Sequence, residues 1–419
     1  MWKPLDLTFD RLVRSGDLVV VDSAGRMHRY GDRTGDQIAI RLADRRLERQ
    51  LVLDPELALG EGYMQGRLQI DDGDAYGLVA LLMRNLTSGG LPRWSRTLEA
   101  ARRAKRRLDQ FNPRRRAARN VRHHYDIDPR IYDLFLDPER QYSCAYFDGT
   151  TSLAAAQRAK MRHIAAKLQL APGQRVLDVG SGWGGLARYL ARTADVAVDG
   201  ITLSATQAEA ACARSEAEGL GDRLRFEIRD YRDITGPYDR IVSVGMLEHV
   251  GAPHFQAYFD SIHRALAEDG IALVHAICRA DDAGGITNPF IAKYIFPGGY
   301  IPALSEVLPG IERAGLIVTD IELLRLHYAE TLKAWRERFL ARRAEAEAIA
   351  GAEFCRMWEL YLAGSEAAFR YENLMVFQIQ LAKRIDTLPL TRDYMLQAER
   401  RLARSESEAH IADATPGHL

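Results

Sequence analysis

Strand-like and helical segments alternate from Gln174 onward, and this alternation limits the possible folds more than any other feature of the chain. Short runs rich in β-branched residues are separated by helical stretches such as GLARYLART and HFQAYFDSIHRALAEDG, and these runs cover residues 175–180, 196–203, 225–230, 239–245 and 271–277. Strands spaced in this way form parallel βαβ units with helices on both faces of one sheet. Ligands of such sheets bind beyond the carboxyl ends of the strands. We therefore expect an α/β fold with a mostly parallel central sheet and a ligand site at that edge.

The rest of the chain is divided around this region. A chain of 419 residues exceeds what one core usually holds, so two domains are expected. Residues 1–110 combine strand-like runs (LVVVD, QIAIRL) with helical ones (PELALGEGYMQG, DAYGLVALLMRNL) and carry no chemical motif, which predicts a smaller accessory domain. Residues 111–125 are expected to be a basic linker, residues 126–404 the second domain, and residues 405–419, which lack periodicity, a flexible tail.

Positive charge is concentrated at the predicted boundary. Ten Lys or Arg residues lie between Arg102 and Arg122 against one acid, Asp109, and Pro113 interrupts any helix there. This segment is either a solvated connector or a surface for anionic lipid headgroups, where each basic residue contributes about 1 kcal/mol. The chain has no net charge and the segment has no aromatic platform, which argues against nucleic acid as a partner.

Cysteine spacing and hydropathy indicate the compartment. The four cysteines lie far apart, the first residues lack the basic-then-apolar pattern of a secretory leader, and no run of about 18 apolar residues occurs. These features predict reduced thiols, a cytoplasmic location and no membrane span. A protein of this kind that acts on lipid must work from the membrane surface.

A glycine-rich segment, VLDVGSGWGG at residues 176–185, connects the first strand of the alternating region to a helix. Its glycines allow tight turns and close approach of a ligand, and the helix N-terminus offers N–H groups to an anion. A dinucleotide-binding loop would be followed about 20 residues later by an acid at the end of the second strand. Thr202 occupies that position, and Asp199 comes three residues early. With Asp178 at the end of its strand, the segment fits a methyltransferase loop better than an NAD loop.

Six separated motifs occur in a fixed order, namely QYSCAYF (141–147), VLDVGSGWGGLA (176–187), GITLSATQ (200–207), DYRD (230–233), SVGMLEHVG (243–251) and KYIFPGGYIP (293–302). In these motifs the chain resembles the cyclopropane-fatty-acyl-phospholipid synthases and their mycolic-acid-modifying relatives, from about residue 122 to about residue 384. The resemblance implies a Rossmann-like domain dependent on S-adenosylmethionine (SAM), which methylates the cis double bond of an unsaturated phospholipid acyl chain. It also implies a homodimer, associated peripherally with the inner face of the membrane.

The same resemblance implies that the carbocation formed by methyl transfer loses a proton to a bound bicarbonate ion and closes a cyclopropane ring. The residues that match the family's bicarbonate ligands are Cys144, Glu248, His275, Ile277 through its amide, and Tyr328. Each side chain also has a purely structural interpretation, as a small buried thiol, a helix cap, a core histidine or a packing residue. Two other hypotheses stay open. One is a methylene or methyl-branched product on the same scaffold, and the other is a non-catalytic lipid-binding protein.

The resemblance also implies a set of SAM-binding residues and no metal ion. It places two residues over the methionine end, two glycines beneath it, three residues at the ribose and adenosine, and two beside the adenine, with Asp178 at the strand end; in that order they are Tyr142, Ser143, Gly180, Gly182, Thr202, Leu203, Gln207, Tyr231 and Arg232. Two positions depart from the family pattern. Ser181 replaces a frequent Cys, and Leu247 replaces the usual Phe, which leaves the product less certain than the cofactor.

Overall fold

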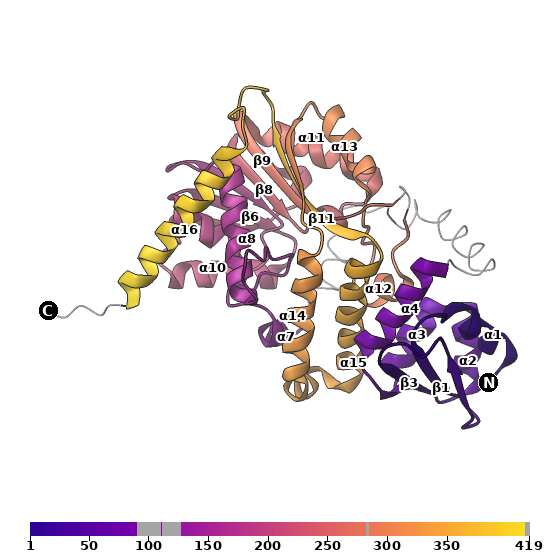
Figure 1. The fold of residues 1–419 in the computed structure, drawn as a ribbon. Helices are drawn as coiled ribbons and strands as arrows, with labels where there is room; N and C mark the ends of the chain where they lie inside the picture. The colour runs from indigo at the N-terminus through magenta and orange to yellow at the C-terminus, as the bar shows by residue number, and fades with distance from the viewer. Residues whose placement is uncertain (90–109, 111–126, 282–284, 415–419) are drawn as a thin grey trace.

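The computed structural model describes residues 1–89, 110, 127–281 and 285–414. These residues form a smaller N-terminal unit and a larger unit built on a central sheet (Figure 1). The whole of the predicted basic linker, residues 111–125, lies outside the described residues. Within the described residues, no helix is both long enough and apolar enough to cross a membrane.

A seven-stranded sheet in the order β10-β11-β9-β8-β5-β6-β7 is the centre of the larger unit. Its strands are β5 (Arg175–Val179), β6 (Ala197–Thr202), β7 (Leu224–Ile228), β8 (Tyr238–Val244), β9 (Leu266–Arg279), β10 (Ile317–Leu323) and β11 (Leu374–Ala382). The five strands from β7 to β9 pair in parallel, whereas β11 pairs antiparallel with both β9 and β10. The predicted α/β fold with a mostly parallel sheet is confirmed.

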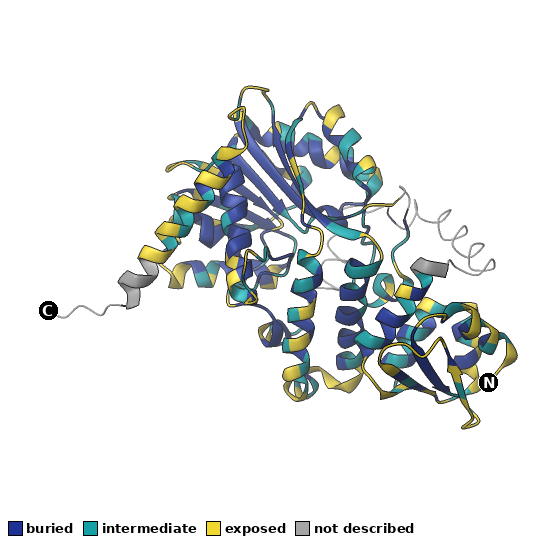
Figure 2. Cartoon of the chain, in the orientation of Figure 1, coloured by how far each residue is buried: buried dark blue, intermediate teal, exposed yellow. Residues whose placement is uncertain are grey.

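Both faces of this sheet are buried, as Figure 2 shows by the dark strands. Neighbouring residues of one strand point to opposite faces, so Val176 packs with one hydrophobic cluster and Leu177 with another. The first cluster includes residues of α8 (Leu153–Leu168), α9 (Gly185–Ala194) and α10 (Ala205–Ala217). The second includes residues of α11 (Phe255–Ala265) and α13 (Leu304–Arg313). Helix α8 begins where the Ser152 hydroxyl accepts the Ala155 N–H.

A layer of helices lies at the carboxyl ends of the parallel strands. It consists of α7 (Pro129–Phe135), α12 (Pro289–Tyr294), α14 (His327–Ala341) and α15 (Arg343–Tyr371), with 3-10 turns η1 (Tyr231–Asp233), η2 (Leu247–His249) and η3 (Ala252–His254) in the nearby loops. Gly351 adopts φ 83° inside α15 and kinks that helix. Many rings of α7, α14 and α15 form one aromatic-rich hydrophobic cluster together with Tyr142 and Trp183.

The N-terminal unit has a four-stranded sheet in the order β2-β1-β3-β4. Its elements are α1 (Lys3–Leu12), β1 (Asp17–Val21), β2 (Met27–Tyr30), β3 (Gln37–Leu42), α2 (Arg45–Leu53), α3 (Pro55–Met64), β4 (Leu68–Asp72) and α4 (Ala75–Gly89). Helices α3 and α4 pack against α15, and Glu61 of α3 accepts hydrogen bonds from Lys293 and Tyr294 of α12. The N-terminal unit is thus joined to the helical layer of the larger unit.

The expectation of a flexible tail over residues 405–419 is wrong for residues 405–414. These residues continue α16 (Asp393–Ala414), which packs against α8. The Glu406 carboxylate accepts hydrogen bonds from Arg162 at 2.8 Å and from the Tyr189 hydroxyl at 2.5 Å. Glu406 attaches this part of the helix through polar contacts, and such contacts leave no apolar periodicity in the sequence.

Candidate functional site

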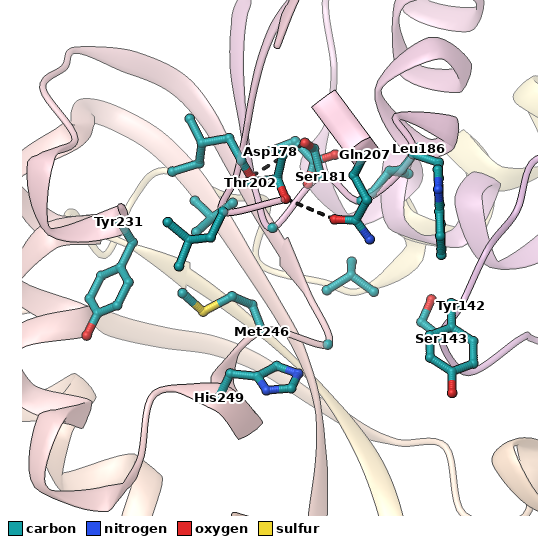
Figure 3. A pocket seen from close by; sticks show the side chains of 18 of the residues that line it. Tyr142, Ser143, Asp178, Ser181, Leu186, Thr202, Gln207, Tyr231, Met246 and His249 are labelled. Atoms are coloured by element: carbon teal, nitrogen blue, oxygen red, sulfur yellow. Dashed lines mark hydrogen bonds between the residues drawn. The ribbon is translucent and has the colours of Figure 1, made fainter. Parts of the chain in front are cut away.

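A pocket lies at the carboxyl ends of β5, β6 and β8, where the loops that follow these strands meet the segment before Cys144 (Figure 3). This is the edge of the sheet at which the strand pattern predicted a ligand. All ten residues predicted to bind the cofactor line this one pocket, namely Tyr142, Ser143, Asp178, Gly180, Gly182, Thr202, Leu203, Gln207, Tyr231 and Arg232. Their individual roles stay predictions.

The glycine loop forms the floor of the pocket through its backbone. Gly180 and Gly182 adopt φ of 86° and 54°, in the left-handed region that favours glycine. A Cβ at Gly182 would meet nothing within 4 Å, whereas one at Gly184 would collide with Phe226 and Ala211. Gly182 therefore leaves room on the ligand side, and Gly184 allows the start of α9 to pack closely.

Asp178 is the second-last residue of β5 and is buried beside the pocket. Burial raises the pKa of its carboxyl to about 7, although the charge of Lys160 opposes this shift. Its Oδ2 has no hydrogen-bond partner among the described residues. A buried acceptor without a partner at a pocket wall fits a ligand that brings its own donor, such as the amino group of SAM.

Thr202 and Gln207 form a second polar pair in the wall. The Thr202 hydroxyl donates to Gln207 Oε1 at 2.9 Å, and the amide nitrogen of Gln207 points into the pocket in Figure 3. Ser204 begins α10 by accepting the Gln207 N–H, which places Gln207 in the first turn of that helix. Thr202, at the position where a dinucleotide-binding fold would have its acid, is thus paired with a neutral amide.

Tyr231 and Arg232 enter the pocket from η1. The Arg232 guanidinium lies 5.2 Å from the centre of the Tyr231 ring and donates to Asp230. His249, which we did not predict as a site residue, also lines the pocket. Burial lowers the pKa of its imidazole to about 4, so the ring is neutral. The signal was present in the EHVG motif, where His249 directly follows Glu248.

The five residues predicted to hold bicarbonate lie outside the lining of this pocket. Two of them meet directly, because the Ile277 N–H donates to Glu248 Oε1 at 2.6 Å. The other oxygen, Glu248 Oε2, is buried and has no hydrogen-bond partner among the described residues. Burial raises the pKa of Glu248 to about 7, against the effect of the Ile277 N–H. The Ile277 amide thus orients Glu248, and its contact with bicarbonate stays a prediction.

His275 precedes Ile277 by two residues on β9, so the two share one face of the sheet. Burial, helped by the charge of Lys160, lowers the pKa of His275 well below its ordinary value, and the ring is neutral. Its Nδ1 lies 3.2 Å from Nε2 of Gln378 on β11. With Gln378 as donor to Nδ1, the hydrogen of the imidazole is on Nε2.

Cys144 and Tyr328 belong to the same hydrophobic cluster as Ile277. Burial raises the pKa of the Cys144 thiol, which stays protonated. The next residue, Ala145, donates its N–H to Thr331 of α14, one turn after Tyr328. The structure thus connects Glu248 with Ile277, and Cys144 with the helix that carries Tyr328.

The parallel sheet and the glycine-lined pocket at its carboxyl edge define the class of SAM-dependent methyltransferases. Residues 112–379 match the family model described as mycolic acid cyclopropane synthetase. The chain belongs to this family and is a SAM-dependent methyltransferase.

Relatives agree with this assignment over most of the chain. The cyclopropane-fatty-acyl-phospholipid synthase of Escherichia coli (strain K12) is 37% identical over 339 residues, covering 81% of this chain and 86% of that protein. A probable fatty acid methyltransferase of Pseudomonas putida is 37% identical over 378 residues, covering 86% of this chain and 91% of that protein. The solved structure of the mycolic acid cyclopropane synthase CmaA1, complexed with S-adenosylhomocysteine (SAH) and CTAB, has a TM-score of 0.60 at 33% identity. The match covers 65% of this chain and 99% of the CmaA1 chain.

Proposed function

We propose that this protein transfers the methyl carbon of SAM to the cis double bond of an unsaturated phospholipid acyl chain and closes a cyclopropane ring. The observation that carries the proposal is a buried carboxyl directly behind the cofactor pocket. Glu248 lies two residues after Met246 and directly before His249, both of which line the pocket, and one of its oxygens has no partner among the described residues.

SAM, when bound, supplies an electrophilic methyl group that the π electrons of the alkene can attack. The protein's part is to hold the donor on the Gly180–Gly182 backbone, with Asp178 and Gln207 as polar contacts. It must also keep water from the cation that forms on the acyl chain. The aromatic cluster suits that task because ring faces attract positive charge without acting as nucleophiles. Within it, Tyr142 stacks on Trp335 with ring centroids 5.0 Å apart.

Bicarbonate, when bound, would supply the base that takes the proton lost on ring closure. The polar groups present fit such an ion, because His275 is a neutral donor and Glu248 Oε2 is an acceptor without a partner in the described part of the chain. The neutral Cys144 thiol donates to the main-chain oxygen of Ala145 at 3.3 Å and would turn to the ion when it binds. A carboxylate beside bicarbonate is repulsive unless it accepts the ion's own hydroxyl hydrogen. We assign that role to Glu248, and to Tyr328 that of a further donor. Ile277 orients Glu248 through the hydrogen bond to Oε1.

The test is a reaction of the purified protein with SAM and vesicles of unsaturated phospholipid. We expect a mass gain of one CH2 unit per double bond and upfield cyclopropane protons in the NMR spectrum of the lipid. The same mass gain with vinylic protons would instead show a methylene product, and a product with a new methyl signal a branched one. A protein that binds SAH by calorimetry yet leaves the lipid unchanged would refute the proposal.

We further propose that the protein is a cytoplasmic homodimer that works on the inner face of the membrane and contacts anionic lipids through its basic segment. Almost all of that segment lies outside the described residues. The support for the proposal is therefore the charge pattern of its sequence. Replacing Arg114, Arg115 and Arg116 by Gln should weaken binding to anionic vesicles, most clearly at low salt. Equal vesicle affinity of both proteins would return the segment to a plain connector. Light scattering should give twice the chain mass.

A further inference from the structure

Lys160 is a completely buried lysine of α8 that the function described above does not use. Its ammonium group donates to Oε1 of Gln141 at 2.5 Å and to the hydroxyl of Ser143 at 2.9 Å. Gln157 lies three residues earlier on the same face of α8, and its amide donates to the main-chain oxygens of Ser143 at 2.9 Å and of Gln141 at 3.3 Å. Two side chains of one helix therefore hold a short segment of chain at four points.

The segment held in this way is Gln141–Cys144, which forms neither helix nor strand. Its first three residues line the cofactor pocket, and the fourth is proposed to hold bicarbonate. Because no ladder of main-chain hydrogen bonds to the described residues fixes this segment, its position depends on contacts with side chains. The four bonds from α8 act there together with those of Asp137 to the Gln141 N–H and of Tyr361 to Tyr142. A buried ammonium group is stable only with several partners, which makes these contacts specific as well as strong.

Lys160 also lies between the two proposed halves of the site. Val176 and Leu273 pack on the face of the sheet that α8 covers. Asp178 comes two residues after Val176, and His275 two residues after Leu273, so both lie on that same face. The titratable groups from other elements that face Lys160 are Asp137, Cys144, Asp178 and His275; on α8 itself His163 and Lys167 lie on the same side, next to His275. Burial lowers the pKa of Lys160 to about 8, against the negative charges of Asp137 and Asp178. The charge of Lys160 therefore changes within a pH range in which binding can be measured.

We propose that Lys160 is a positioning residue of this methyltransferase. Its ammonium group holds Gln141–Cys144 against α8, and this sets the wall of the cofactor pocket and the Cys144 thiol in one position. The effect on the pocket stands on the methyltransferase fold alone, and only the effect on Cys144 rests on the proposed function.

The test compares Lys160→Met with Lys167→Met. Lys167 lies two turns further along the same helix and is equally buried, but its ammonium group binds Glu322 of β10, and it does not line the pocket. Methionine keeps the length of the side chain and removes its charge and donors. We expect Lys160→Met to bind SAH about tenfold more weakly by calorimetry, because charge-assisted hydrogen bonds to the pocket wall are lost. Lys167→Met should melt at a lower temperature and keep its SAH affinity.

The pH profile of SAH binding separates positioning from general stability. In the wild-type protein and in Lys167→Met, affinity should fall as the pH rises through the pKa of Lys160, because the neutral amine makes weaker hydrogen bonds. Lys160→Met should lack this limb. The amino group of SAH titrates in all three proteins alike and so cancels in the comparison.

A second variant covers the case in which Lys160→Met does not fold. Gln157→Leu removes the other two hydrogen bonds without burying an unpaired charge, and should weaken SAH binding in the same direction by a smaller factor. Wild-type affinity in Gln157→Leu, or wild-type affinity and pH profile in Lys160→Met, would overturn the inference. A wild-type protein that binds no SAH would instead contradict the methyltransferase assignment itself.

Discussion

The cofactor pocket and the five residues proposed to hold bicarbonate are built in different ways. The pocket is formed mainly by the loops that follow four adjacent parallel strands, β8, β5, β6 and β7. The five residues come from four separate segments, namely the stretch after α7, the turn η2, the strand β9 and the helix α14. The pocket is therefore a property of the fold, whereas the second group depends on how four segments pack together.

The two regions also differ in their electrostatics. The pocket has groups at its wall that can change charge or accept a donor, such as Asp178 with a pKa raised by burial to about 7. In the second group, burial keeps His275 and Cys144 neutral and raises the pKa of Glu248 to about 7. Neutral donors suit a bicarbonate ion, because they hold its negative charge in place without adding a second anion that would repel it. Variants of each region should therefore fail in different assays.

The largest effect is expected from Glu248→Gln, which tests whether the second group acts apart from the pocket. The amide keeps the volume and can still accept the Ile277 N–H, but it presents a donor where Oε2 presents an acceptor. We expect turnover on lipid vesicles to fall about 100-fold, the range typical of a misplaced acid–base partner. SAH affinity, measured on the same protein, should stay within a factor of about two. Full turnover in this variant would remove Glu248 from the proposed role.

Gly182→Ala should produce the opposite result. Alanine at φ 54° is strained by about 1–2 kcal/mol, and its methyl group would enter the open side of the loop where we expect the ligand. We expect SAH affinity to fall about tenfold. The control is Gly173→Ala, where φ is 79° and a Cβ also meets nothing within 4 Å, but which lies before β5 and away from the pocket. Equal loss in both variants would mean that backbone strain alone is responsible.

This difference in construction explains how much could be predicted from the sequence. Periodicity alone predicted the parallel strands, and the strand–glycine–helix pattern predicted the edge at which the pocket lies. It did not predict β10 and β11, since antiparallel pairing at the sheet edge depends on contacts between residues more than 50 positions apart, such as Leu323 with Phe377. Nothing local distinguished Lys160 from a surface lysine, because its partners Gln141 and Ser143 precede its helix in an irregular segment.

The five-residue group could be proposed only from the family resemblance. No spacing rule connects Cys144 with Tyr328, which are brought into one cluster by α14 and the strands beside it. The resemblance implies that the Ile277 amide binds the ion, and in the structure that amide donates to Glu248. A hydrogen bond between a main-chain donor and a buried carboxylate 29 positions away is a tertiary contact, and sequence motifs do not predict it.

Tyr361→Phe sits between the two regions and should have a moderate effect. The Tyr361 hydroxyl of α15 lies 2.7 Å from that of Tyr142, a pocket residue whose ring stacks on the aromatic cluster. Loss of one buried hydrogen bond corresponds to about 1 kcal/mol, so we expect turnover to fall about fivefold, with a smaller change in SAH affinity. Tyr189→Phe is the matched control, because its hydroxyl binds Glu406 far along α16. A larger effect of the control variant would show that helix docking, and not the position of Tyr142, limits turnover.

The smallest functional effect is expected from Glu399→Gln, which alters stability while leaving both regions in place. Glu399 of α16 lies 2.9 Å from Nδ1 of His163 on α8, and Glu322 lies 2.7 Å from Nε2. Burial lowers the pKa of His163, but the hydrogen bonds to Glu322 and Glu399 outweigh it and raise the pKa overall. A raised histidine pKa stabilises the fold fully below the unfolded value of about 6.5, and the contribution disappears as the pH rises through the folded value. Glu399→Gln should therefore lower the free energy of unfolding by about 1 kcal/mol at pH 6, and by less at pH 9, in denaturant titrations.

Because the pair of Glu399 with His163 lies outside the pocket lining and the five-residue group, SAH affinity and turnover of the folded variant should match the wild type. A loss of turnover without a loss of stability would mean that α16 is coupled to the site through α8, and the division of the molecule into two independent regions would be wrong.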